Sequence, residues 1–219
     1  MFSSTCPLAY RHKPFTPLLR LCFAWCVVLL LTLAAPARAA ITSGVISFGT
    51  GHAEDYSTPV SNQNGLSFSD PSNGWLYASP AGGGSLAACT DATGDAIMPF
   101  NGGPSSPSTA DIRAATGGDR FNLKGVKIVN RSANTKITFT GYRNPGNLVG
   151  SFDLPVTKIL SGTCYQHFTF TPAQQAAVAN VDWVRVTSDN DYNFMIDDLN
   201  VEPVVPAPTV TGLSPTSGP

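Results

Sequence analysis

The feature that most constrains this chain is a series of short apolar runs separated by clusters of Gly, Pro, Asn, Asp and Ser. Inside the runs, apolar side chains recur at every second position, as on the buried face of a β-strand. We expect strands at residues 44–49, 65–69, 74–79, 96–100, 120–130, 135–143, 147–156, 165–170, 182–188 and 192–201. Ten short strands with turn residues between them predict an all-β fold, an antiparallel β-sandwich.

The two-residue period breaks once inside the longest run. Phe121 and Leu123 share one face, whereas Val126 and Ile128 share a face that is out of phase by one residue. The break falls at Gly125, and an extra residue at that point would restore the alternation. The pattern therefore predicts a β-bulge at Gly125.

One short connector helix is predicted at residues 171–180. Thr171 suits the N-cap, Pro172 the first helical position and Gln174 the third position of a capping box. Residues 101–119, in contrast, read as a loop that is long for a compact domain. Loops of that length are usually either functional or mobile.

The first 39 residues have the three parts of a secretory signal peptide. Basic residues open the segment, an apolar run of 15 residues fills positions 21–35, and Ala37-Arg38-Ala39 provides a small-x-small cleavage site. The alternative is an uncleaved membrane anchor, for which the apolar run is short. We expect the mature chain to begin at Ala40, with a sandwich module at residues 40–203.

Cleavage would change the balance of charge. It would remove four of the 13 basic residues and none of the 14 acidic ones, leaving a formal charge of −5. A mildly acidic exported domain has no electrostatic reason to bind nucleic acid or an anionic membrane surface. After cleavage the chain would have no segment long enough to span a membrane.

Cleavage would also leave two of the five cysteines, Cys89 and Cys164. In an oxidising compartment two cysteines predict one disulfide. Two free, buried thiols are the alternative, because pairing cannot be deduced from sequence.

Two adjacent aspartates interrupt the last predicted strand, in the stretch NFMIDDLNV at residues 193–201. Alternation would place Asp197 and Asp198 on opposite faces, so that one carboxylate lies on the core face. A buried carboxylate needs a partner. That partner could be the backbone N–H groups of a neighbouring turn or a structural Ca²⁺ ion, for which Glu54 and Asp55 would be the natural second source of oxygen ligands.

Residues 120–201 resemble the jelly-roll modules of exported bacterial proteins, in the galactose-binding-like and carbohydrate-binding group. The resemblance rests on the Phe-x-Leu start of FNLKGVKIVN, the TGYRNPGN strand and turn, and the closing FMIDDLNV strand. It implies a jelly-roll-type sandwich and a structural calcium that Asp197 or Asp198 would help to hold. The ligand-binding aromatic residues of the group map onto no position here.

The end of the chain changes character at residue 204. A Pro-rich linker leads into PTVTGLSPTSGP, residues 208–219, which resembles the start of an IPT/TIG immunoglobulin-like domain. The alternative is a simple Pro-rich tail. The resemblance implies that the chain is the front part of a longer modular protein.

No catalytic set stands out in the sequence. The stretch GGGSLAAC lacks the second Gly of a nucleophile elbow, and no Cys/His cluster suits zinc. We expect a non-catalytic module for adhesion or glycan contact, with Trp75 and Tyr77 as a stacking platform for a sugar ring. The alternatives are a core position for Trp75, a structural spacer without ligand, and a secreted hydrolase.

Overall fold

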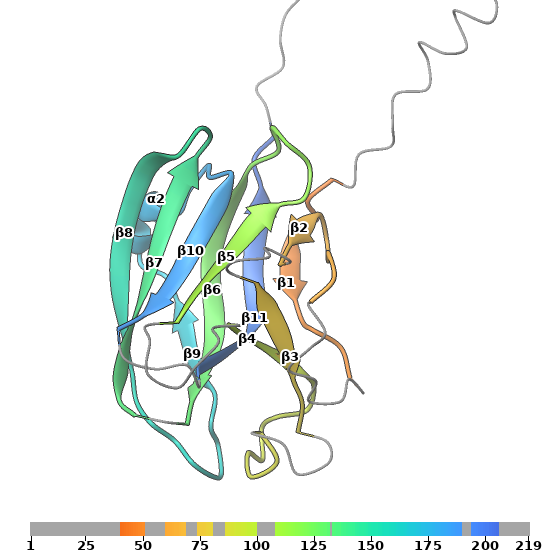
Figure 1. Cartoon of the computed structure of the whole chain (residues 1–219), viewed down its shortest axis with the longest axis vertical. Coiled ribbons are helices and arrows are strands. Elements are labelled where there is room, and N and C mark those ends of the chain that lie inside the picture. Colours follow the sequence, from red (N-terminus) through yellow and green to blue (C-terminus); the bar gives the residue numbers. More distant parts are fainter. Residues whose placement is uncertain are drawn as a thin grey trace, which may run out of the picture. The chain divides into compact units, whose positions relative to one another are not determined.

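The structure is a computed structural model that describes residues 40–50, 60–68, 74–80, 86–99, 108–131, 133–189 and 194–205. These residues form one short helix, α2 (Pro172–Ala177), and a set of strands (Figure 1). The strands are β1 (Gly44–Ile46), β2 (Leu66–Ser67), β3 (Trp75–Ala78), β4 (Ala96–Pro99), β5 (Thr109–Ala114), β6 (Phe121–Asn130), β7 (Thr135–Arg143), β8 (Asn147–Val156), β9 (Gln166–Thr169), β10 (Trp183–Ser188) and β11 (Phe194–Pro203).

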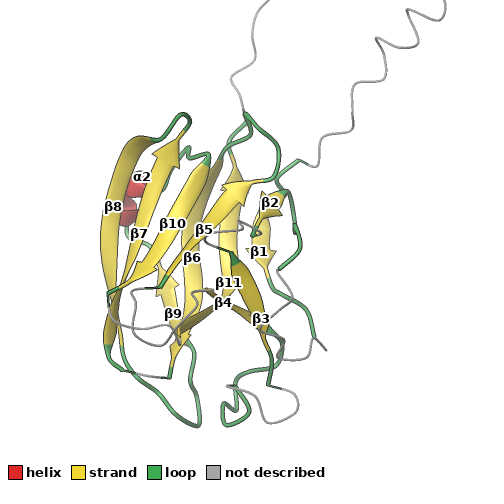
Figure 2. Ribbon diagram, viewed as in Figure 1, coloured by secondary structure: helices red, strands yellow, loops and turns green. Residues whose placement is uncertain are grey.

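The strands form two antiparallel sheets that face each other (Figure 2). One sheet has the order β3-β4-β11-β6-β9, with β1 also pairing to β11, and the other has the order β2-β5-β10-β7-β8. From β4 to β11 the chain passes repeatedly from one sheet to the other. The resulting orders, β4-β11-β6-β9 and β5-β10-β7-β8, are those of a jelly roll. The predicted all-β sandwich with one short helix is confirmed.

The main core lies between the two sheets. Its largest fully buried side chains are aromatic, among them Trp75, Phe121, Phe139 and Phe194. A second, smaller apolar cluster lies on the outer side of the six-stranded sheet, where Met195 and Val129 alternate with core residues. Both Cys89 and Cys164 belong to this outer cluster, so part of this sheet is covered on both faces.

The bulge predicted at Gly125 is confirmed. Strand β6 pairs with β11 through Gly125–Asn200 and then Leu123–Val201, which leaves Lys124 as an extra residue. The extra residue shifts the phase, so that Leu123 and Val126 are both buried in the main core.

Helix α2 begins as predicted. The Thr171 hydroxyl accepts from the Gln174 backbone N–H at 3.4 Å, and the Gln174 side-chain oxygen accepts from the Thr171 backbone N–H at 2.9 Å. The helix ends at Ala177 and packs on β8. It approaches so closely that a Cβ atom at Gly150 would lie 2.8 Å from the Ala177 Cα atom.

The prediction of a continuous loop at residues 101–119 is wrong for its central part, because Thr109–Ala114 forms β5. This strand pairs with both β2 and β10. Its buried face consists of Ala110 and Ile112, with Ala114 packed beside them. Such small side chains give a weak two-residue signal, and Asp111 and Arg113 between them raise the polarity of the run.

Candidate functional site

The predicted disulfide is confirmed. Cys89 and Cys164 are bridged, with their Cα atoms 5.4 Å apart and a separation of 75 positions in sequence. Asp91 ties the same two segments together, accepting from the backbone N–H groups of Cys164 at 2.8 Å and Tyr165 at 2.9 Å. Burial opposes ionisation of Asp91, but these hydrogen bonds hold its pKa below the ordinary value.

The predicted sugar platform at Trp75 and Tyr77 is wrong. The exposed fractions of these two residues are 0% and 5%, and both point into the main core. The Trp75 indole N–H donates to the backbone oxygen of Asp111 at 3.0 Å, and the Tyr77 hydroxyl accepts from the Gln63 amide at 3.2 Å. A ring enclosed between two sheets cannot stack on a ligand.

The paired aspartates lie at a second bulge, in β11. Asp197 pairs with Lys127 and Asn200 with Gly125, so that Asp198 and Leu199 together stand opposite Val126. Asp198 has a φ of 45°, in the left-handed region. Because the bulge shifts the phase, neither carboxylate lies in the main core, and the prediction that one must lie there is wrong.

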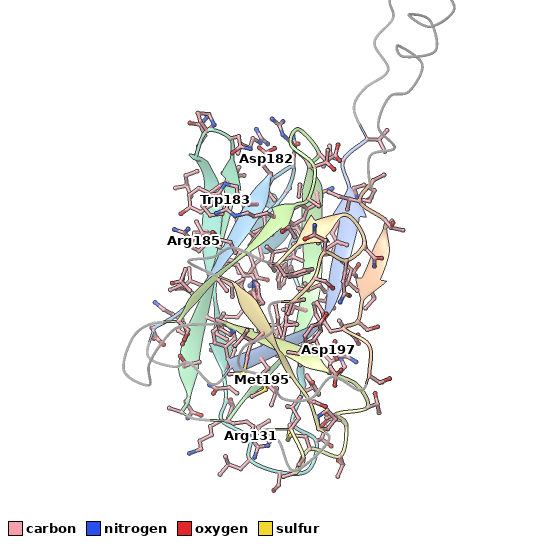
Figure 3. The ribbon with its side chains drawn as sticks, turned by 45° about the vertical axis from the view of Figure 1, so that its right-hand side comes forward. Arg131, Asp182, Trp183, Arg185, Met195 and Asp197 are labelled. Carbon is pink, nitrogen blue, oxygen red and sulfur yellow. A yellow bond between two sulfur atoms is a disulfide. The ribbon has the colours of Figure 1, made fainter. Side chains whose placement is uncertain are left out.

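Asp197 is half-buried on the outer side of the six-stranded sheet, close to Met195 (Figure 3). Its carboxylate accepts from the Asp198 backbone N–H at 2.8 Å and also from the Phe48 backbone N–H. Burial raises the pKa of Asp197 to about 6, while these N–H groups and Lys127 act in the opposite direction. Asp197 therefore links β11 to the segment that follows β1.

Asp198 has a different partner. Its carboxylate oxygen lies 2.5 Å from the Lys127 ammonium nitrogen, and this hydrogen bond raises the pKa of Lys127. Glu54 and Asp55, the other predicted calcium ligands, lie outside the described residues. Among the residues that the structure describes, no three His, Cys, Asp or Glu side chains are placed to hold a metal ion together.

The outer face of the five-stranded sheet carries a row of large side chains that the sequence analysis did not single out. Four cross-strand partners make up this row, which we call the aromatic row: Arg113 on β5, Trp183 on β10, Tyr142 on β7 and Leu148 on β8. On β5, β10 and β8 an adjacent residue faces the other way: Ile112 and Val184 belong to the main core, and Val149 packs against it.

The side chains of the aromatic row stack against one another. The rings of Tyr142 and Trp183 are nearly parallel, with their centroids 3.9 Å apart. The guanidinium carbons of Arg113 and Arg185 lie 4.6 and 4.9 Å from the centroid of the Trp183 ring. These contacts combine aromatic stacking with cation–π attraction and fix the rings on the sheet.

A buried carboxylate orients both guanidinium groups. Asp111 accepts from Arg113 at 2.6 Å and from two nitrogen atoms of Arg185 at 2.9 and 3.1 Å. The Asp111 side chain is fully buried, whereas those of Arg113 and Arg185 are 38% and 34% exposed. Figure 3 shows Trp183 and Arg185 on β10, well apart from Asp197 on the other sheet.

A signal for this face was present in the sequence. In DWVRVTS the apolar Val184 and Val186 alternate with Trp183 and Arg185, which places Trp183 on the polar face of its strand. The cross-strand partners of Trp183 could not be predicted from this alternation, because the order of the strands in the sheet decides which residues lie beside Trp183.

Among the residues described, no helix is long and apolar enough to cross a membrane.

Comparison with known proteins defines no family for the chain. No family model matches the sequence, and no curated protein matches it. A DUF4465 family protein from Bacteroides caccae is similar in structure, with 17% identity, a TM-score of 0.38, and coverage of 60% of this chain and 73% of that one.

Two carbohydrate-active enzymes are also similar over part of their length. An arabinose-bound GH51 α-L-arabinofuranosidase gives 10% identity, a TM-score of 0.43, and coverage of 77% of this chain and 27% of the enzyme. The CBM22-1 and GH10 modules of Clostridium thermocellum xylanase 10B, complexed with xylohexaose, give 11% identity and a TM-score of 0.37. The match covers 74% of this chain and 28% of the xylanase chain. Likenesses this distant say nothing about a ligand. The class that the strand order defines is a jelly-roll β-sandwich.

Proposed function

We propose that residues 40–203 form a non-catalytic module of an exported bacterial surface or secreted protein that contacts glycans through the aromatic row. The observation that carries the proposal is the row itself, since Trp, Tyr and Arg side chains stand together on an outer sheet face with fixed orientations. The aromatic row replaces the predicted platform at Trp75 and Tyr77 as the proposed site of glycan contact.

The chemistry of the row suits a sugar chain. Sugar rings present apolar C–H groups next to hydroxyl groups, so they need aromatic or aliphatic contact beside hydrogen-bonding side chains. Tyr142, Trp183 and Leu148 would supply the apolar contact along their outward edges, because the ring faces within the stack are already in contact. The guanidinium groups and the hydroxyls of Thr140 and Ser151, in the neighbouring row, would bind sugar hydroxyls.

The test is a glycan-array screen of the exported module, followed by titration of the best ligand. Leu148→Ala and Tyr142→Ala should weaken binding by at least about fivefold, because each removes apolar contact. Leu160→Ala is the matched control, since Leu160 is similarly exposed but lies on a loop outside the row. Equal effects of Leu148→Ala and Leu160→Ala would contradict the proposed face.

A structural spacer without ligand is the competing function. It would be favoured if the module bound no glycan on the array. The non-catalytic part of the proposal has a separate test. Glycans that bind should be recovered intact after long incubation, and release of shorter products would show hydrolase activity.

Export is supported by the disulfide, because such bonds persist in oxidising compartments. The predicted signal peptide, residues 1–39, lies outside the described residues. N-terminal sequencing of the exported protein should find Ala40 first. The IPT/TIG-like start at residues 208–219 also lies outside them and remains part of the proposal.

A structural calcium ion is a further part of the proposal, with Asp197, Glu54 and Asp55 as ligands. Its support is that Phe48, whose N–H contacts Asp197, comes shortly before the segment that holds Glu54 and Asp55. Asp198 fits less well, because the positive charge of Lys127 beside its carboxylate repels a cation. Chelation should lower the melting temperature of the wild type but not of Asp197→Asn. A wild-type melting temperature that ignores chelator and added calcium would leave Asp197 as a hydrogen-bonded latch.

A further inference from the structure

The outer face of the six-stranded sheet contains a hollow of about 180 Å³ between β1, β11, β6 and β9. It lies on the opposite sheet from the aromatic row, and it contains Asp198, one of the two aspartates that the sequence singles out. None of the functions proposed above uses it.

One cross-strand row that runs through the hollow lacks a side chain at its centre. Val45, Asn200, Gly125 and Thr169 are successive partners on the four strands. A Cβ atom at Gly125 would lie 2.6 Å from the Phe168 carbonyl oxygen, so no other residue fits there without moving β9. Strand β9 therefore lies close to β6 at Gly125, at the point where both bulges occur.

The walls of the hollow are polar and balanced in charge. Lys127 and Asp198 form an ion pair along one side, and His167 is the cross-strand partner of Lys127 on β9. Asn200 and Thr169 are exposed on either side of Gly125, and Val45 adds an apolar rim. The lining residues carry one formal positive and one formal negative charge, so neither an anion nor a cation is favoured as ligand.

We propose that this hollow binds one neutral sugar unit through its neighbouring hydroxyl groups. A sugar hydroxyl both donates and accepts, and here the donor Lys127 stands beside the acceptor Asp198, while Asn200 and Thr169 can do either. The volume is below the roughly 300–1,000 Å³ of clefts that take drug-sized ligands, which limits the occupant to about a single ring. The inference does not depend on the aromatic row.

The test is a titration of the ¹⁵N-labelled chain with methyl pyranosides of glucose, galactose and mannose, followed by NMR. At least one should shift the backbone amides of Lys127, Thr169 and Asn200 in a saturable way, with a dissociation constant of about millimolar for so small a ligand. Methyl glucuronide should bind more weakly than its neutral counterpart. Tighter binding of the glucuronide would overturn the argument from charge balance.

Two variants and a control locate the site. Asn200→Ala should weaken binding about fivefold to tenfold, the effect of one hydrogen bond, and Thr169→Tyr should fill the hollow and abolish binding. Asn147→Ala, at an exposed position on the other sheet, should bind as the wild type does. Dispersed spectra would show that each variant is folded.

The outcomes separate this site from the proposed glycan face. Shifts confined to Tyr142 and Trp183 would overturn the hollow as a site and support the aromatic row. Shifts at Lys127 and Asn200 with none at Trp183 would support the hollow and count against the row. No saturable shift with any of the neutral sugars would overturn the inference.

Discussion

At the scale of single residues, the adjacent aspartates have separate roles because the strand that carries them is not regular. Asp197 accepts backbone hydrogen bonds, and Asp198 pairs with Lys127. The sequence correctly indicated that a carboxylate in this strand needs a partner. The shift in phase between Ile196 and Leu199 is the same kind of signal as the break at Gly125, but the predicted alternation ran through both aspartates without a bulge.

Asp197→Asn should change the dependence of stability on pH. The folded pKa of Asp197, about 6, lies above its ordinary value of 3.8, so its protonated form favours the folded state. That contribution is complete below pH 3.8 and is lost as the pH rises through 6. The variant, which mimics the protonated form, should therefore gain free energy of unfolding relative to wild type at pH 8, by about 3 kcal/mol at most.

Urea unfolding of both proteins between pH 4 and pH 8, with chelator present, measures this difference. Other carboxylates whose pKa values are lowered, such as Asp91 and Asp189, cancel in the comparison. The difference should vanish near pH 4. A variant that is less stable than wild type at pH 8 would show that the charge of Asp197 is itself stabilising.

Trp75→Ala and Trp183→Ala should differ strongly in their cost. Trp75 is fully buried and donates a hydrogen bond, so its removal should lower the free energy of unfolding by about 3–5 kcal/mol. Trp183 is half-buried on the outer face, and its removal should cost about 1–2 kcal/mol from lost stacking and cation–π contacts. Chemical denaturation of the two variants measures both costs, and similar values would contradict the assignment of core and surface.

At the scale of elements, the long strands and the helix could be predicted from the sequence, whereas their neighbours could not. Clean alternation defined β7 and β10, and the capping residues Thr171 and Gln174 defined the start of α2. Strand β5 was missed because Ala110 and Ala114 give little hydrophobic signal. The aromatic row was missed because its members come from four strands, and pairing between strands is set by the whole fold.

Gly141→Ala should displace α2 from the sheet. A Cβ atom at Gly141 would overlap the carbonyl oxygen of Ala177 and touch Val181. Overpacking of this kind costs about 1–3 kcal/mol. Gly117→Ala is the matched control, because nothing lies within 4 Å of a Cβ atom there, and it should change stability by less than about 0.5 kcal/mol. Thermal melts would compare the two, and equal effects would contradict the close approach of the helix.

Reduction of the disulfide should destabilise the fold without abolishing the two-sheet core. The bond joins segments of the outer cluster, and closing a loop of this length is worth about 4.5 kcal/mol at most in the chain-entropy model. The melting temperature should fall with reductant in the wild type, whereas the Cys89→Ala/Cys164→Ala variant should not respond. Two reactive thiols in denatured, unreduced protein would contradict the bridge in the exported chain.

At the scale of the whole molecule, the two sheets divide the surface into faces of different chemistry. The five-stranded sheet presents the aromatic row, with its guanidinium groups held by Asp111. The six-stranded sheet presents the neutral hollow at Gly125 and the apolar cluster beneath the disulfide. A module that binds at both faces could link two glycan chains, or two parts of one chain, and would then bind with greater avidity than either site alone.

The sandwich should fold without the residues that follow it. Strand β11 ends at Pro203, and the Val204 N–H donates to the Arg120 carbonyl oxygen at 2.9 Å, while Val205 is 82% exposed. A chain of residues 40–205 should therefore melt cooperatively and within about 2 °C of one that continues to residue 219. A chain that stops at residue 203 loses the Val204 hydrogen bond, which costs about 0.5–1.5 kcal/mol, and it should still unfold in one transition. Calorimetry of the three chains measures this. If only the longest gave a cooperative transition, residues 206–219 would be part of the domain and not the beginning of another.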